Sequence, residues 1–206
     1  MKKLAVYLSI CLGLGLITQA NAEGNAEAGK ARSATCAACH GVDGNSVNPQ
    51  WPSLAGQDSG YIARQLMAFK SGERENALMS PQAMGLTDQD VEDLAAYFSS
   101  QTIAAGTADA ELAPAGERLY RGGNLEANIA ACAACHGPTG RGNPPASYPA
   151  LAGQHADYVV VQLKAFREGS RKTDASMNQM MRNVAARMTD NEMRAVAAYI
   201  QGLRSE

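Results

Sequence analysis

The sequence is short of aromatic residues, of basic charge and of long apolar runs. Phe, Trp and Tyr together make up 5% of the 206 residues, which is little for filling a core, so another apolar body could make up the difference. Eighteen Lys and Arg stand against 20 Asp and Glu, and without a basic excess no nucleic-acid-binding surface is expected. The one long apolar run, Leu4 to Ile17, falls short of the ~20 residues of a membrane-spanning helix.

The N-terminal segment instead has the three parts of a secretory signal peptide. Met1-Lys2-Lys3 is followed by the apolar run and then by Ala20-Asn21-Ala22, a small-x-small exit. We predict cleavage after Ala22, which removes residues 1–22 and leaves an exported mature chain. A membrane anchor is the alternative interpretation of the same segment.

Cysteine is also scarce in the mature chain. Of the five Cys, Cys11 leaves with the signal peptide, and the other four form two Cys-x-x-Cys pairs. An even count in an oxidising compartment ordinarily favours disulfides, but here the spacing favours a different use of the thiols.

The two pairs belong to an internal duplication of the whole mature chain. Matched blocks recur at offsets that grow from 96 through 97 to 102 residues, so small insertions separate them. The blocks are Cys36-Ala37-Ala38-Cys39-His40-Gly41 with Cys132-Ala133-Ala134-Cys135-His136-Gly137, Pro52-Ser53-Leu54-Ala55-Gly56-Gln57 with Pro149-Ala150-Leu151-Ala152-Gly153-Gln154, and Ala95-Ala96-Tyr97 with Ala197-Ala198-Tyr199. A period this long is typical of two copies of one domain rather than of a solenoid.

Each copy predicts the same series of helices and no convincing strand. Helices are expected over Ala26–Ala34, Tyr61–Lys70 and onward from Thr87 in the first copy, and over Ala115–Tyr120, Tyr158–Arg167 and onward from Thr189 in the second. Gly72 and Gly169 are expected to end the middle helices, and Thr87 and Thr189 to open capping boxes. The fold class is all-α with two tandem domains, residues 23–105 and 106–206, joined within Ser99–Leu112.

The Cys-x-x-Cys-His motif places both thiols and the imidazole on one face of a helix, because residues i, i+3 and i+4 share a face. Two thiols can bind the two vinyl groups of a haem while the imidazole reaches the iron, which is the c-type haem attachment motif. Covalent haem is therefore expected at Cys36 and Cys39 and at Cys132 and Cys135, with His40 and His136 as axial ligands. A redox dithiol, a zinc half-site and a disulfide are the alternatives.

The sixth iron ligand decides between an electron carrier and an enzyme, since an open position admits oxygen or peroxide. Methionine opposite histidine gives an electron-transfer centre of raised potential. Met79 and Met181 each lie nine residues before the Asp that follows Thr87 or Thr189, and no other Met pair shares that relation. We predict these two as ligands, with Met84, Met180 and Met177 as the rivals and core packing as the default for any Met.

The ring nitrogen of each histidine that does not bind iron is expected to contact the loop that follows the histidine. Pro52 and Pro149 are candidates to offer a backbone carbonyl to the other ring nitrogen of each histidine, or are simply rigid turns. Tyr61, Tyr158, Arg74 and Arg171 are candidates to neutralise haem propionates, or are ordinary surface. His155 is expected at the surface or at a haem edge, because its counterpart is Asp58.

Taken together, these blocks resemble the dihaem cytochrome c4 family, within the class I cytochromes c. The resemblance covers essentially the whole mature chain, and by position the family's methionine ligands fall on Met79 and Met181 and its proline acceptors on Pro52 and Pro149. It implies two class I cytochrome c domains related by a pseudo-twofold axis, with two covalently bound haem c groups. It also implies a periplasmic single-electron carrier between a cytochrome bc complex, or another donor, and a haem-copper terminal oxidase, with some members loosely membrane-associated.

The sequence thus favours a monomeric electron-transfer protein that turns over no substrate at the iron. The first rival is a dihaem peroxidase in which one iron lacks a permanent sixth ligand, and the matched methionines argue against it. The second rival is a haem-bearing electron-acceptor subunit for a dehydrogenase, which would share every motif above.

Overall fold

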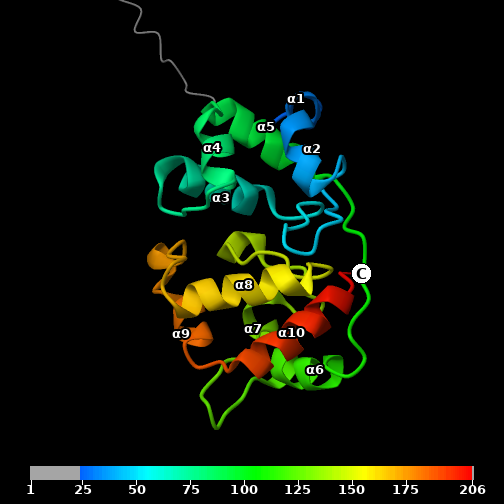
Figure 1. Ribbon diagram of the computed structural model, residues 1–206, viewed down its shortest axis with the longest axis vertical. Helices are drawn as coiled ribbons and strands as arrows, with labels where there is room; N and C mark the ends of the chain where they lie inside the picture. The colour runs from blue at the N-terminus through cyan, green and yellow to red at the C-terminus, as the bar shows by residue number, and fades with distance from the viewer. Residues whose placement is uncertain (1–23, 206) are drawn as a thin grey trace, which may run out of the picture.

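The computed structural model describes residues 24–205, and the predicted signal peptide therefore lies outside the described residues. Two helical domains are stacked one on the other along the longest axis of the molecule (Figure 1). The helices of the first domain are α1 Ala26–Arg32, α2 Ala34–His40, α3 Ser59–Ser71, α4 Met79–Met84 and α5 Asp88–Ser99. Those of the second are α6 Ala113–Gly122, α7 Ala133–His136, α8 Ala156–Arg167, α9 Met180–Ala185 and α10 Asp190–Gly202, with 3-10 turns at Pro144–Ala146 and Ala175–Met177.

In the first domain, the N-terminal helix α1 crosses the C-terminal helix α5, and α3 packs on α5 from another side. The α1–α5 crossing is close because Gly29 has no side chain: a Cβ there would lie 1.9 Å from the Asp93 carbonyl oxygen. The core comes from one face of α5, where Val91, Leu94 and Phe98 are almost fully buried. This is the i, i+3, i+7 face that the sequence pattern predicts.

The second domain repeats this packing with α6, α8 and α10. Gly116 takes the place of Gly29, and a Cβ on it would lie 2.0 Å from the Ala195 carbonyl oxygen. Tyr120, Met193 and Val196 fill the core. Within residues 24–205 the only β pairing is two isolated bridges, Asn124–Ile129 and Asn143–Tyr148, so the all-α expectation is confirmed.

The ends of the helices follow local signals in the sequence. Thr87 with Asp90, and Thr189 with Glu192, form complete capping boxes at the starts of α5 and α10. Gly72 ends α3 in the left-handed conformation, where glycine avoids the steric cost of a Cβ. The short helices α4 and α9, which carry the candidate methionines, were not predicted.

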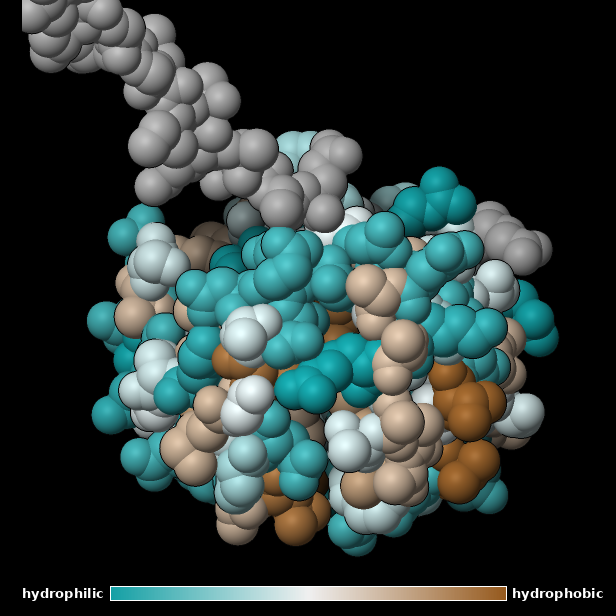
Figure 2. All heavy atoms as spheres, turned by 90° about the horizontal axis from the view of Figure 1, so that it is seen from above, coloured by the Kyte–Doolittle hydropathy of each residue, from teal (hydrophilic) through white to brown (hydrophobic). Residues whose placement is uncertain are grey.

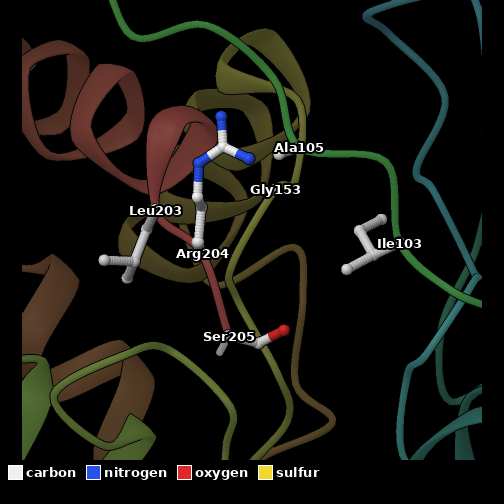
Figure 3. A pocket seen from close by; sticks show the side chains of 6 residues that line it. All are labelled: Ile103, Ala105, Gly153, Leu203, Arg204 and Ser205. Carbon is white, nitrogen blue, oxygen red and sulfur yellow. The ribbon is translucent and has the colours of Figure 1, made fainter.

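The segment between α5 and α6 is held by both domains. The Asn45 side chain of the first domain binds the Thr102 carbonyl and the Ala104 amide, and Gln201 of the second domain donates to the Thr107 carbonyl. A small cavity of ≈ 130 Å³ lies between this segment and the C-terminal residues, lined by Ile103, Ala105, Gly153, Leu203, Arg204 and Ser205 (Figure 3). None of these lining residues is a Cys, His or Met.

The outer face of the first domain is mainly hydrophilic, with small separate apolar patches (Figure 2). Exposed apolar side chains of this domain include Val42, Val47, Leu78 and Met84. Among the described residues, no helix has the length and hydropathy needed to cross a membrane.

Candidate haem sites

Each Cys-x-x-Cys-His motif ends a helix, so its three side chains share one face. Cys36, Cys39 and His40 lie within α2. In the second domain Cys132 immediately precedes α7 with helical backbone angles, and its carbonyl accepts from the His136 amide at 2.9 Å. All four thiols are free and half-buried. The predicted i, i+3, i+4 arrangement is thus present in both domains.

The two histidine rings are buried, with 5% and 7% of their surface exposed. Nδ1 of His40 lies 2.8 Å from the Pro52 carbonyl oxygen, and Nδ1 of His136 lies 2.8 Å from that of Pro149. A carbonyl only accepts, so Nδ1 carries the proton and Nε2 is left for a metal. Burial lowers the pKa of both imidazoles, outweighing the opposite effect of the proline carbonyls, and the neutral form is the one that binds metals.

The chain turns sharply directly after each histidine. Gly41 and Gly137 both adopt φ values near +80°, a region that residues with a side chain avoid. At Gly41 a Cβ would also lie 2.2 Å from the Asn45 carbonyl oxygen. The turn starts the loop that returns to the proline, and so brings the proline carbonyl to the histidine of the same domain.

The thiols do not resemble those of a redox dithiol. Burial raises the pKa of Cys132 to about 11 and also raises the pKa of Cys36. A reactive thiol needs a lowered pKa and a positively charged setting. Among residues 24–205 there is also no group of three or more His, Cys, Asp or Glu placed to hold a metal ion, so a zinc site has no support.

Met79 is the first residue of α4, and Met181 is the second residue of α9. Both side chains are half-buried, and each is followed four residues later by a fully buried alanine, Ala83 or Ala185. α4 packs on α3 as α9 packs on α8, and Met181 also contacts the core of the second domain.

The rival methionines differ from one another in their surroundings. Met84 is 64% exposed. Met180 accepts a weak 3.8 Å contact from the hydroxyl of Tyr148, whose ring centroid lies 6.1 Å from that of His136. Met180 is therefore linked through Tyr148 to the surroundings of His136.

The interface between the domains contains the tyrosines and arginines for which the sequence left two interpretations. Arg74 donates to the Tyr158 hydroxyl and to Gln162, and Arg171 donates to the Tyr61 hydroxyl and to Gln65. Arg74 and Arg171 are buried, so an ordinary surface role is wrong for both. His155 also crosses the interface, where its Nε2 donates to the Ser46 carbonyl at 2.8 Å.

Comparison with known proteins identifies the family. The cytochrome c family model matches residues 26–102 and 115–204. Cytochrome c4 of Azotobacter vinelandii is 45% identical over 95% of this chain and 97% of its own length. This chain belongs to the cytochrome c4 family. The crystal structure of reduced recombinant cytochrome c4 from Pseudomonas stutzeri superposes with a TM-score of 0.85 at 47% identity, covering 88% of this chain and all of that one.

Membership of the cytochrome c4 family makes the chain an electron-transfer protein of two tandem cytochrome c domains with two covalently bound haem c groups. The residues present fit this cofactor, because each motif offers two free thiols and one neutral imidazole with a free Nε2. A further relative, 43% identical over 80% of this chain and 76% of its own length, is a thiosulfate dehydrogenase electron acceptor of Stutzerimonas stutzeri (strain A1501).

Sequence reasoning assigned no role to Gln57 and Gln154, although both lie in the duplicated blocks. In the structure each glutamine reaches the other domain beside a proline that contacts a histidine. Their recurrence at the same offset was the available signal, but a contact between domains cannot be located from spacing within one domain.

Proposed function

We propose that the chain is a single-electron carrier in which His40 and Met79 bind one haem iron and His136 and Met181 bind the other. The observation that carries the proposal is the pair of buried histidines, each donating Nδ1–H to a proline carbonyl at 2.8 Å. When bound, each haem supplies a one-electron Fe(III)/Fe(II) couple. With the haem bound, the thioethers of Met79 and Met181 would exclude external ligands from the iron and favour its reduced state.

The protein is proposed to act as a monomer in the periplasm after removal of residues 1–22. Residues 23–105 form the first haem domain and residues 106–206 the second. Its electron donor is a cytochrome bc complex or another donor, and its acceptor is a haem-copper terminal oxidase. Loose association with the membrane would shorten the path between these partners, and no role in nucleic-acid binding is expected.

A second candidate function is electron acceptance from a thiosulfate dehydrogenase. Two relatives named as thiosulfate dehydrogenase electron acceptors, 43% and 42% identical over 80% and 81% of this chain, support it. Both functions use the same two haems and differ only in the donor.

The two donors are separated by mixing the oxidised mature protein with each of them and recording the reduced-haem absorption. Respiratory membranes with quinol are expected to reduce it at a rate that a bc-complex inhibitor abolishes, and cyanide is expected to block its reoxidation by oxygen. Faster reduction by a thiosulfate dehydrogenase with thiosulfate would favour the second candidate. Sustained peroxide turnover without a partner protein would contradict both candidates and favour a peroxidase.

A further inference from the structure

Two glutamine side chains reach across the domain interface in a reciprocal arrangement. Gln154 of the second domain accepts from the Ser53 amide at 3.0 Å and donates to the Ser53 carbonyl at 2.9 Å. Gln57 of the first domain accepts from the Ala150 amide and donates to the Ala150 carbonyl, both at 2.9 Å. Each glutamine therefore holds one residue of the opposite domain at two points.

The residue held in each case directly follows the proline that contacts the histidine. The Ser53 N–H and the Pro52 C=O are the two ends of one peptide unit, and the Pro52 oxygen accepts from His40 Nδ1 at 2.8 Å. A continuous hydrogen-bonded chain therefore runs from the His40 imidazole through this peptide unit to Oε1 of Gln154.

The same chain exists in the second domain with the roles of the domains exchanged. His136 Nδ1 donates to the Pro149 oxygen at 2.8 Å, and the Ala150 N–H of that peptide unit donates to Gln57 Oε1. The reciprocal contacts thus give each histidine a terminal acceptor from the domain that does not bind its haem.

The orientation of both glutamine amides is fixed by a second donor. Oε1 of Gln154 also accepts from the His155 amide, and Oε1 of Gln57 from the Asp58 amide, both at 3.0 Å. Because backbone N–H groups only donate, the atom that they share must be the oxygen. Gln57 and Ser53 are buried, and hydrogen bonds polarise one another most strongly away from water.

Polarisation along this series of hydrogen bonds affects the reduction potential of the haem iron. A peptide unit that donates its N–H carries more negative charge on its oxygen, which strengthens the hydrogen bond from the imidazole. A stronger acceptor at Nδ1 raises the basicity of the ligating nitrogen. A more basic ligand stabilises Fe(III) over Fe(II), and hydrogen bonding around the ligands is one of the means by which a protein sets the potential of a haem.

We propose that Gln154 and Gln57 are positioning residues, each of which tunes the reduction equilibrium of the haem in the opposite domain. The proposal rests on the proposed function, since it takes His40 and His136 as axial ligands. It makes the docking of the domains part of the redox chemistry: separation of the domains removes the terminal acceptor from both histidines at once.

The test replaces each glutamine by methionine, which keeps the length of the side chain and removes both polar groups. The two haems of the holoprotein are titrated separately through their NMR methyl resonances. Gln154→Met is expected to favour reduction of the first-domain haem by about three- to tenfold, where tenfold corresponds to 59 mV for a one-electron couple. Gln57→Met is expected to do the same to the second-domain haem only, and in each case the Nδ1 proton resonance of the affected histidine should shift.

Gln201→Met is the matched control, because Gln201 binds the Thr107 carbonyl and the Ala156 amide and neither proline peptide. It is expected to leave both equilibria unchanged. Gln154→Glu keeps an acceptor for the Ser53 amide and is expected not to raise the potential of the first-domain haem. This variant tests the proposal if Gln154→Met separates the two domains.

The outcomes distinguish the two proposals. Unchanged equilibria in both methionine variants, or a shift confined to the haem of the substituted domain, would overturn the role of the glutamines and leave the ligation intact. If the unsubstituted protein lacks the weak far-red sulfur-to-iron band, the axial ligation fails and the inference fails with it.

Discussion

Arg171 donates a hydrogen bond of 2.7 Å to the hydroxyl oxygen of Tyr61 across the domain interface. Its counterpart Arg74 donates to Tyr158 at 3.1 Å. Burial would raise the pKa of Tyr158, but the guanidinium groups of Arg74 and Arg171 outweigh burial and lower it. Both cations are thus stabilised by oxygen atoms of the opposite domain.

Replacing Tyr61 by Phe is expected to destabilise the haem-loaded protein by about 1.5–3 kcal/mol, the range for hydrogen bonds to charged groups. Tyr158→Phe should also destabilise the protein, because the Tyr158 hydroxyl accepts from Arg74 and lies beside both guanidinium groups. Denaturant unfolding followed by haem absorption measures both. In a double-mutant cycle with Arg171→Met, the losses at Tyr61 and Arg171 should not add; strict additivity would show that the bond contributes nothing.

Replacing Met79 or Met181 singly by His is expected to lower one reduction potential and leave the other close to its original value. An imidazole in place of a thioether stabilises Fe(III), whereas methionine raises the potential. Spectroelectrochemical titration gives both potentials, and each variant should lose half of the far-red band. Met84→His and Met180→His are the controls, and an effect of either one equal to that of its neighbour would reassign the ligand.

The two close helix crossings predict matched losses of stability. Gly29→Ala and Gly116→Ala place a Cβ within 2.0 Å of the Asp93 and Ala195 carbonyl oxygens, so the helices must separate at a cost of about 1–3 kcal/mol or more. Thermal unfolding measures the loss. Gly122→Ala is the control in the same helix as Gly116, since nothing lies within 4 Å of its added Cβ. It should be neutral or stabilise, and equal losses at all three sites would refute the steric explanation.

Asp190 makes the stability of the folded protein depend on pH, and the direction of this dependence follows from its two cationic neighbours. Hydrogen bonds from Lys164 and Arg167 lower the pKa of Asp190 to about 2. A lowered pKa stabilises the folded state above the unfolded value of about 4, and this contribution is lost as the pH falls towards 2. Asp190→Asn should therefore lower the melting temperature slightly at pH 7, and not near pH 2 or in high salt. A difference that persists at pH 2 would contradict this assignment.

Much of the local structure could be predicted from the sequence because its signals are local. The capping residues Thr87 and Thr189, the apolar stripes of α5 and α10 and the spacing of each Cys-x-x-Cys-His motif act within a few residues. The duplication allowed each half to be compared with the other, and the prediction of Met79 and Met181 as ligands rests on that comparison.

The remaining features depend on contacts that no local pattern encodes. α4 and α9 are six residues long, below the length at which periodicity is visible, and they exist because they pack on α3 and α8. Arg74 and Arg171 have the residue type and spacing of surface groups, and only docking of the domains buries them. The roles of Gln57 and Gln154 depend on the same docking.

The most direct test of the account is the far-red absorption of the oxidised, unsubstituted protein, measured per chain with the haem content known from its intact mass. If one histidine and one methionine coordinate the iron at each site, the protein should carry two thioether-linked haems. Its sulfur-to-iron band should then have twice the strength of a single site. Carbon monoxide should leave the reduced spectrum unchanged. One haem per chain, a band at half that strength, or rapid uptake of carbon monoxide would contradict it.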